Sequence, residues 1–458
     1  MTRLTSETKS PHAASRRNHS PWRDRPDIPE SIKLLFLVLA GLVTAASAFF
    51  FNTPAEIWKG NLKILTSPAN LLTDYIELSN MGSTFFNAGV MALISVATIK
   101  LARAEITGVI VAGVFTLMGF SFFGKNLFNS IPIILGVALF AKLARRPMKT
   151  YLVQATFGTA LGPLVSEITF NLGLPPLPAV LLGAGAGVLT GLVLPPLSEH
   201  FVRFHKGFSL YNVGFTAGII GMFFLAVLRS FDIEVLPVSV LSSGNNLRLG
   251  IWLFSLFAAV LVFGLYCARW SLRGYKNLMA QPGTLGSDFI GSAGFGLTAV
   301  NMAVLGALMT AYVLLMKGEL NGPTIGGIFT VFSFGAFGKH IRNVVPIICG
   351  VFIANLLNIH EASSTVALLS ALFGTTLAPV AGVYGFGWGA MAGFLHMAVT
   401  MNTCYLHGGM NLYNNGFSGG FVAAALIPLI EKWRSIRKHG PADAQEPQYV
   451  ETQAGGRQ

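Results

Sequence analysis

The sequence predicts an all-α, polytopic integral membrane protein with about fourteen transmembrane or re-entrant helices in two inverted repeats of about seven. Three observations predict this fold. First, 53% of the 458 residues are hydrophobic and only 11% are charged, whereas soluble domains carry about 25% charged residues. Second, the charges lie in short islands between apolar runs of about 20 residues, the length that crosses a hydrocarbon core. Third, the two halves of the chain match each other.

The chain divides into two tails and two membrane repeats. Residues 1–32 are polar and rich in Arg, Ser and Pro, so we expect a disordered cytoplasmic tail. The same is expected of residues 433–458. The first repeat is predicted to occupy residues 33–230 and the second residues 231–432.

Fourteen apolar runs are the candidate spans. The first, residues 34–52, ends in small residues that resemble a signal-peptide cleavage site, but its length favours a retained helix. The others are residues 83–99, 107–123, 127–143, 150–165, 178–197, 208–228, 249–268, 296–316, 322–337, 342–358, 364–379, 383–404 and 410–430. The fifth and twelfth runs end at Pro163 and Pro379, so each is either a full span or a re-entrant half-helix. The segment Ile64–Ile76 is a further re-entrant candidate.

Basic residues set the predicted orientation. The net charge of +12 comes from Lys and Arg at the ends of apolar runs, which is the positive-inside pattern rather than a nucleic-acid surface. If all fourteen runs cross the membrane from a cytoplasmic N-terminus, these basic residues fall in the cytoplasmic loops. Omitting the fifth and twelfth runs would place Arg269, Arg273 and Lys276 outside. We therefore expect a bacterial inner-membrane protein with both termini in the cytoplasm.

The two halves align in sequence over most of their length. At a shift of 214 residues, Phe123–Pro132 matches Phe337–Pro346 through a shared Phe-Gly-Lys, an Asn and a Pro. At a shift of 202 residues, Leu210–Phe215 matches Leu412–Phe417 through Leu-Tyr-Asn and Gly-Phe. Seven spans per half is an odd number, so the second half is expected to be inverted relative to the first.

A repeated asparagine marks four places in the predicted spans. Gly is followed five residues later by Asn twice in each half, and the four asparagines are Asn87, Asn212, Asn301 and Asn414. An amide inside a span has two donors and an acceptor to satisfy without water, so it must face another helix, a broken backbone or an aqueous cavity. Contacts between helices are favoured for any single asparagine, and the repetition makes a substrate pathway about equally well supported for the set.

The repeated Phe-Gly-Lys-x-x-x-Asn-x-x-Pro motif places a flexible break, a cation, an amide and a helix-kinking proline within ten residues. It contributes Lys125 and Asn129 to the first half and Lys339 and Asn343 to the second. Such discontinuities expose backbone groups that bind solutes or ions. The alternative is an ordinary helix start whose lysine side chain extends to the membrane surface. Two tyrosines that precede repeated asparagines complete the candidate pathway, namely Tyr211 and Tyr413.

The remaining polar residues indicate little other chemistry. His205, beside a lysine, is expected to be a solvated loop residue, and His396 a core histidine bonded to a neighbour. The few carboxylates in the membrane region, Glu167 among them, lie at predicted span ends, which favours a channel or facilitator over a proton or sodium pump. Sodium bound by carbonyls and amides remains open.

No motif for a cofactor or a metal is recognisable. The three cysteines have no metal-ligand spacing, and the Gly-x-Gly-x-Gly-x-x-x-Gly rows lie inside apolar spans, where they predict close helix packing rather than nucleotide binding. We find no pairing of a nucleophile with a base. Neither cofactor nor metal is therefore expected, no nucleic-acid partner is expected, and an enzyme is disfavoured.

Two resemblances follow from these motifs. Phe123–Pro132 and Leu210–Phe215, with their second-half counterparts, resemble an uncharacterised family of bacterial polytopic membrane proteins, domain of unknown function 1576, over the whole chain. This resemblance implies no activity. Phe86-Asn87 and Tyr211-Asn212 are similar, over short segments, to the aromatic-Asn pairs in the inverted halves of urea transporters. The urea-slot signature is not recognisable here, so urea specificity is not implied.

Together these features predict a membrane channel or secondary transporter for an unidentified small molecule or ion, with its pathway at the interface of the two inverted repeats. The lipid bilayer is its expected surroundings, and a homo-oligomer remains open. One alternative is a non-transporting membrane subunit or partner-binding protein of a larger complex. Another is an intramembrane enzyme, which requires His396, His407 and Tyr413 to converge.

Overall fold

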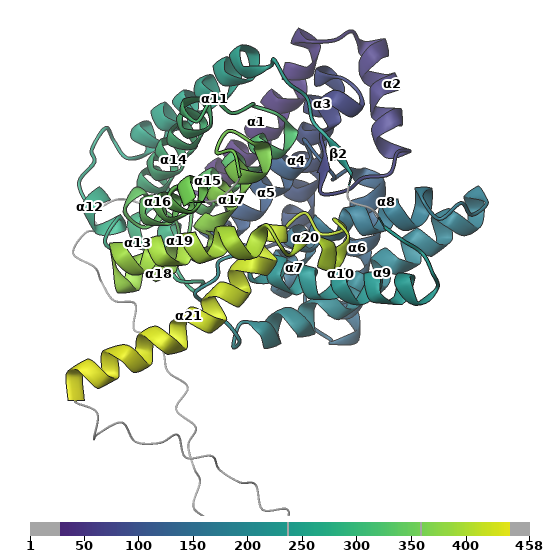
Figure 1. Ribbon diagram of the computed structural model, residues 1–458. Helices are drawn as coiled ribbons and strands as arrows, with labels where there is room; N and C mark the ends of the chain where they lie inside the picture. The colour runs from purple at the N-terminus through teal and green to yellow at the C-terminus, as the bar shows by residue number, and fades with distance from the viewer. Residues whose placement is uncertain (1–27, 236–237, 358–359, 440–458) are drawn as a thin grey trace, which may run out of the picture.

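The computed structural model describes residues 28–235, 238–357 and 360–439 and is almost entirely helical (Figure 1). The first half contains α1 (Glu30–Ser47), α2 (Pro54–Leu65), α3 (Tyr75–Leu78), α4 (Met81–Leu101), α5 (Gly108–Phe120), α6 (Leu127–Leu143), α7 (Leu152–Phe157), α8 (Gly162–Phe170), α9 (Pro176–Phe201) and α10 (Asn212–Ser230). The second half contains α11 (Asn246–Cys267), α12 (Tyr275–Leu278), α13 (Phe289–Ala293), α14 (Phe295–Leu315), α15 (Gly322–Phe334), α16 (Ile341–Leu357), α17 (Thr365–Gly374), α18 (Ala378–Tyr384), α19 (Phe386–Thr400), α20 (Cys404–His407) and α21 (Asn414–His439). Two short strands, β1 (Leu72–Thr73) and β2 (Ser239–Val240), pair in parallel.

Length and composition identify an all-α membrane protein. Within the described residues, seven helical segments are long and apolar enough to cross a membrane: α1 with the turn after it, α4, α9, α10, α11, α14, and α17 together with α18. The helices α5, α6, α15 and α16 are apolar but shorter. Every one of the fourteen predicted apolar runs contains helix. The protein is therefore a multi-pass helical membrane protein.

The two proline-containing runs are broken helices. A 3₁₀ turn at Gly158–Leu161 separates α7 from α8, and another at Thr375–Leu377 separates α17 from α18. Pro163 and Pro379 then lie in the first turn of the helix that follows, where proline is tolerated because the missing N–H has no helical partner. Each helix therefore breaks before its proline and continues beyond it.

The ends of the described chain are more helical than expected. α1 begins at Glu30 and α21 continues to His439, so residues 30–32 and 433–439, assigned above to tails, are helical. The rest of both predicted tails lies outside the described residues. The re-entrant candidate Ile64–Ile76 holds the end of α2, the strand β1 and the start of α3, so no helix runs through it.

Equivalent helices of the two halves pack against each other in antiparallel fashion at α5 and α15. The start of α5 lies at the end of α15, because a Cβ built on Gly108 would overlap the carbonyl oxygen of Ala336. The start of α15 lies at the end of α5 in the same way, with a Cβ on Gly322 only 2.5 Å from the carbonyl oxygen of Phe122. These matching contacts place the two equivalent helices side by side at the centre of the molecule.

A second pair of equivalent helices, α10 and α21, meets through small residues. A Cβ on Gly214 would lie 2.7 Å from Cβ of Tyr413, and one on Gly416 would lie 3.1 Å from Cβ of Tyr211. Glycine lets the helices approach this closely. The contact brings Tyr211 and Tyr413 together from opposite halves, with ring centroids 5.4 Å apart.

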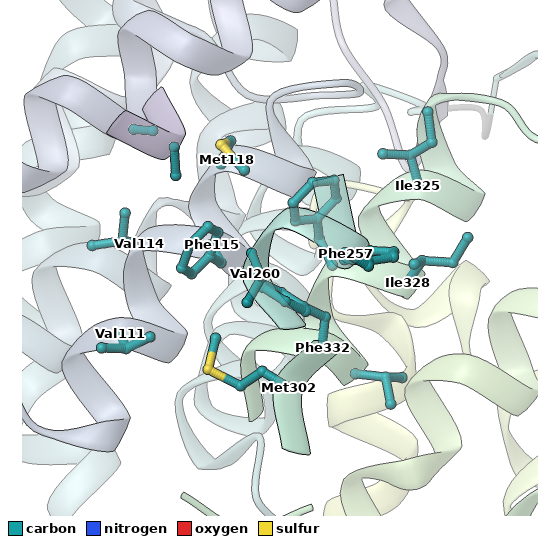
Figure 2. Close-up of a cluster of buried hydrophobic side chains, with 14 of the residues drawn as sticks. Val111, Val114, Phe115, Met118, Phe257, Val260, Met302, Ile325, Ile328 and Phe332 are labelled. Carbon is teal, nitrogen blue, oxygen red and sulfur yellow. The ribbon is translucent and has the colours of Figure 1, made fainter. Parts of the chain in front are cut away.

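Aromatic and branched side chains fill the core between the halves, as Figure 2 shows for α5, α11, α14 and α15. The Phe332 ring of α15 lies 5.0 Å from that of Phe115 of α5 and 5.0 Å from that of Phe257 of α11. Edge-to-face and tilted rings at these distances pack favourably. The apolar core therefore holds residues of both halves in one body.

Candidate functional site

The centre of the molecule contains two backbone breaks, one after α5 and one after α15. Asn87 of α4 donates from Nδ2 to the carbonyl oxygens of Ser121 (2.7 Å) and Lys125 (2.9 Å). Asn301 of α14 donates to Gly335 and Lys339 (2.8 Å each). Carbonyls freed at the end of a helix need such partners. The two asparagines therefore hold the breaks in place.

A second pair of asparagines also binds backbone groups at the two breaks. Asn129 donates from Nδ2 to the carbonyl oxygen of Gly124 (2.9 Å), and Asn343 donates to that of Gly338 (2.9 Å). Their Oδ1 atoms accept from the backbone N–H of Asn126 (3.0 Å) and His340 (2.9 Å). The amides of all four asparagines at the breaks thus bind backbone groups.

The third pair, Asn212 and Asn414, binds histidines. His205 Nε2 lies 2.9 Å from Asn212 Oδ1, and His407 Nε2 lies 2.9 Å from Asn414 Oδ1. His205 is fully buried, so the expectation of a solvated loop histidine was wrong. Its ring packs edge-on against Phe215. The lysine next to His205 in the sequence indicated an exposed loop and gave no sign of this contact.

His396 is a buried core histidine, as expected. Its Nε2 lies 3.0 Å from Asn415 Oδ1 and 3.2 Å from Thr400 Oγ1. His396 and His407 therefore bind different asparagines, and neither ring has a hydrogen bond to the Tyr413 hydroxyl in the described part of the chain.

Both repeated lysines are fully buried, which excludes side chains that extend to the membrane surface. Lys339 Nζ donates to the hydroxyl of Tyr211 and lies 4.5 Å from the centre of the Tyr211 ring and 4.8 Å from that of Phe334. Lys125 Nζ lies 4.9 Å from the centre of the Phe120 ring. Among the described residues Lys125 Nζ has no hydrogen-bond partner within 3.5 Å.

A cavity of about 450 Å³ leads from one side of the molecule to the two tyrosines. Of the ten predicted pathway residues, Tyr211, Asn212 and Tyr413 line it, and Phe157 and Phe334 add aromatic surface. The other seven do not line it. Its outer lining comes from the connections that precede α5, α7 and α13, at Thr107, Thr150 and Gly286–Asp288.

Two carboxylates join the halves, a role that sequence reasoning missed. Asp288 is half-buried and accepts from the N–H of Gly108 at the start of α5 (3.0 Å). Asp74 is fully buried and lies against the start of α15, where a Cβ built on Gly322 would be 2.6 Å from Asp74 Oδ1. The signal was present in the repeat, since Asp74-Tyr75-Ile76 matches Asp288-Phe289-Ile290.

The surroundings of Asp74 and Asp288 differ. Ser242, just after β2, donates to Asp74 Oδ2 from its N–H (3.0 Å) and its hydroxyl (2.5 Å). The Asp74 N–H donates to the carbonyl oxygen of Val240 (2.9 Å). Burial raises the pKa of the Asp74 carboxyl, and the hydrogen bond from Ser242 opposes that shift. The segment at β2, which connects the two halves, therefore covers Asp74, whereas Asp288 lines the cavity.

Glu167 is a buried carboxylate near the end of α8. It lies in the last turn of the helix. Asn171 donates to Oε2 (2.5 Å), and Asn70 approaches Oε1 (3.5 Å). The run was predicted to end near Pro163, but α8 continues beyond the proline and carries Glu167 with it.

Comparison with known proteins identifies a family. The family described as "Protein of unknown function (DUF1576)" matches residues 53–230 and 267–432, one segment in each half. No curated protein and no solved structure matches. These comparisons give no support to the similarity with urea transporters.

Proposed function

The chain belongs to the family described as "Protein of unknown function (DUF1576)", and we propose that it is a membrane channel or secondary transporter for a small solute. One observation carries the proposal. The cavity of about 450 Å³ reaches two equivalent tyrosines, Tyr211 and Tyr413, at the centre of the molecule. Transporters built from repeats bind their substrates at such an interface, next to broken helices.

The antiparallel contact of α5 with α15 supports two inverted repeats of seven spans each. Equivalent helices that run in opposite directions are expected when one repeat is upside down in the membrane. The fourteen predicted runs, each with helix, fit seven spans per repeat. The proposed pathway therefore follows the interface of two inverted repeats.

Basic loops support an inward-facing cavity. The connections before α5 and α7 border the cavity, and they carry four basic residues: Arg103, Arg145, Arg146 and Lys149. By the positive-inside rule these loops face the cytoplasm. We take the membrane to be the bacterial inner membrane and both termini to be cytoplasmic.

The difference between Asp74 and Asp288 favours a transporter over an open channel. On the proposed cytoplasmic side Asp288 lines the cavity, while on the opposite side Ser242 and Val240 bond to Asp74. A pathway open on one side and closed on the other is the arrangement that alternating access requires. The segment at β2 is the proposed gate on the closed side.

Removing the Ser242 hydroxyl is expected to loosen this gate. In Ser242→Ala the 2.5 Å bond to Asp74 Oδ2 is lost, so a cysteine placed at Thr73, which pairs with Val240, should react severalfold faster with a membrane-impermeant thiol reagent. The measurement uses intact cells and a background without the three native cysteines.

Ser230→Ala is the matched control, because its exposed hydroxyl binds only a carbonyl of its own helix. An unchanged rate in Ser242→Ala would show that β2 does not close the pathway.

Flux through the purified protein tests the proposal itself. Proteoliposomes that contain only this protein should swell in an osmotic assay when a transported solute is supplied, with or without a sodium or proton gradient. Ser287→Cys places a thiol in the lining of the cavity, and its modification by a bulky thiol reagent should reduce the flux at least fivefold.

Ser230→Cys, on an exposed surface, should leave the flux unchanged after the same treatment. No flux across a panel of neutral and ionic solutes would contradict transport and favour the membrane-subunit alternative, which predicts co-purification with other proteins.

A further inference from the structure

The two buried lysines point to the chemical class of the solute. Resting on the transport function proposed above, we infer that the solute is a small anion, and that Lys125 and Lys339 are its charge partners, one in each repeat. The inference follows from the charge balance at the centre, from two unpaired polar atoms, and from the difference between the two equivalent sites.

Neither Lys125 nor Lys339 has a carboxylate partner among the described residues. In the described part of the chain no carboxylate oxygen lies within 4.0 Å of either lysine nitrogen, since the ion pairs there are Lys33–Glu30 and Lys206–Glu431. Asp74 and Asp288 are engaged with backbone N–H groups and with Ser242. Without a counter-charge, burial disfavours the charged form of each lysine. An anion that enters the site would supply that charge.

Each lysine nitrogen lies over the face of at least one aromatic ring. Lys125 Nζ lies over Phe120, and Lys339 Nζ lies over Tyr211 and Phe334, all within 5 Å of the ring centres. The ring quadrupole attracts a cation without neutralising it. The two sites therefore remain available to an anion.

The two sites differ in their hydrogen bonds. Lys339 donates to the hydroxyl of Tyr211. At the equivalent site neither Lys125 Nζ nor the Tyr413 hydroxyl, which lies near Thr116, has a hydrogen-bond partner within 3.5 Å among the described residues. One lysine–tyrosine pair is thus joined while its counterpart is apart.

Lys125 and Tyr413 both pack against the ring of Phe120. Lys125 Nζ lies 4.9 Å from the centre of the Phe120 ring, and the Tyr413 ring lies 4.6 Å from the same centre. Both polar groups are donors with no acceptor of their own, and an unpaired buried donor is unfavourable. A small oxyanion or carboxylate, with several lone pairs, would satisfy both.

The cavity gives the anion a route to this pair. Tyr413 belongs to the cavity lining together with Tyr211, and its ring packs against Phe120, over which Lys125 Nζ lies. In the opposite, outward-facing state the pseudo-symmetry predicts the reverse arrangement, with Lys125 bonded to Tyr413 and Lys339 released from Tyr211. The anion would pass from one lysine to the other as the two pairs exchange.

Anion flux in proteoliposomes tests this inference. The probes are nitrate, formate, acetate and inorganic phosphate, with urea and glycerol as neutral comparators. We expect saturable flux of at least one anion and at least a tenfold loss of it in Lys125→Met and in Lys339→Met. Methionine fills a similar volume without charge, so the folded protein should persist.

Lys317→Met, at an exposed lysine, is the control and should keep the wild-type flux. Tyr413→Phe keeps the ring and removes the unpaired hydroxyl, so it should raise the half-saturating anion concentration at least threefold while the maximal rate changes less. This variant keeps the inference testable if a lysine variant does not fold.

The outcomes separate the inference from the proposed function. Flux of urea or glycerol without any anion flux, or anion flux that both lysine variants retain, would overturn the anion inference and leave transport standing. No flux of any probe would overturn both.

Discussion

Replacing Asn301 with alanine is expected to destabilise the folded protein by about 2–6 kcal/mol, because two buried carbonyl groups lose their donor at about 1–3 kcal/mol each. These are the carbonyls of Gly335 and Lys339, each 2.8 Å from Asn301 Nδ2. Asn87→Ala should have a similar effect, since its amide binds the equivalent break. Thermal unfolding of the purified protein in detergent, followed by size-exclusion chromatography, measures the loss.

Asn402→Ala is the matched control for both variants. Its Nδ2 donates to the carbonyl of Ala398 (2.9 Å) at an exposed position, where water replaces the bond. If Asn301→Ala melted at the same temperature as Asn402→Ala, the break after α15 would have to be held by other contacts. The double variant Asn87→Ala/Asn301→Ala should show nearly additive losses if the two breaks are independent.

Adding one methyl group at Gly350 is expected to be as damaging as removing an asparagine. Gly350 of α16 faces α19 so closely that a Cβ would collide with the carbonyl oxygen of Ala390. Gly136 of α6 meets the carbonyl of Val188 of α9 in the same way. Overpacking costs about 1–3 kcal/mol where side chains can adjust. Backbone atoms cannot change rotamer as a side chain can, so the loss of folding free energy in Gly350→Ala should exceed that range. The yield of monodisperse protein should fall as a result.

Gly387→Ala is the control for this prediction. Gly387 lies in α19, and no atom lies within 4 Å of the position that an added methyl group would take, so alanine should be neutral or slightly stabilising through its helix propensity. The yield and the melting temperature of the two variants are compared in the same detergent. Equal behaviour of Gly350→Ala and Gly387→Ala would show that α16 and α19 can separate without loss.

The two Gly-x-Gly-x-Gly-x-x-x-Gly rows show which part of the helix packing could be predicted from the sequence. Gly187 and Gly191 of α9, and Gly389 and Gly393 of α19, are in tight contact with neighbouring chain, as predicted for the rows as a whole. Gly185 and Gly387, two residues along, have nothing within 4 Å. Residues two apart on a helix point to different faces. Composition therefore predicted close packing, and the position of the neighbouring helix decided which glycines need it.

The polar residues show where prediction from the sequence stopped. The asparagines were predicted to face another helix, broken backbone or a cavity, and the structure assigns Asn87 and Asn301 to broken backbone. Asn212 lines the cavity and also binds His205. A side chain with both donors and an acceptor can satisfy any of these partners equally well. Which one it meets depends on segments up to 38 residues away.

The sequence by itself determined the multi-pass helical membrane fold, the positions of the apolar runs and the match between the halves, because hydropathy and repeated motifs are local properties of the chain. Only the tertiary structure decided that Lys125 and Lys339 are fully buried, that Asp74 lies against the start of α15, and that the segment at β2 covers Asp74. Those outcomes depend on contacts between residues more than 120 positions apart, which no local pattern encodes. The partners of charged and amide groups are set by the surrounding fold. The two halves differ because the single segment that connects them, at β2, covers Asp74 and cannot also cover Asp288.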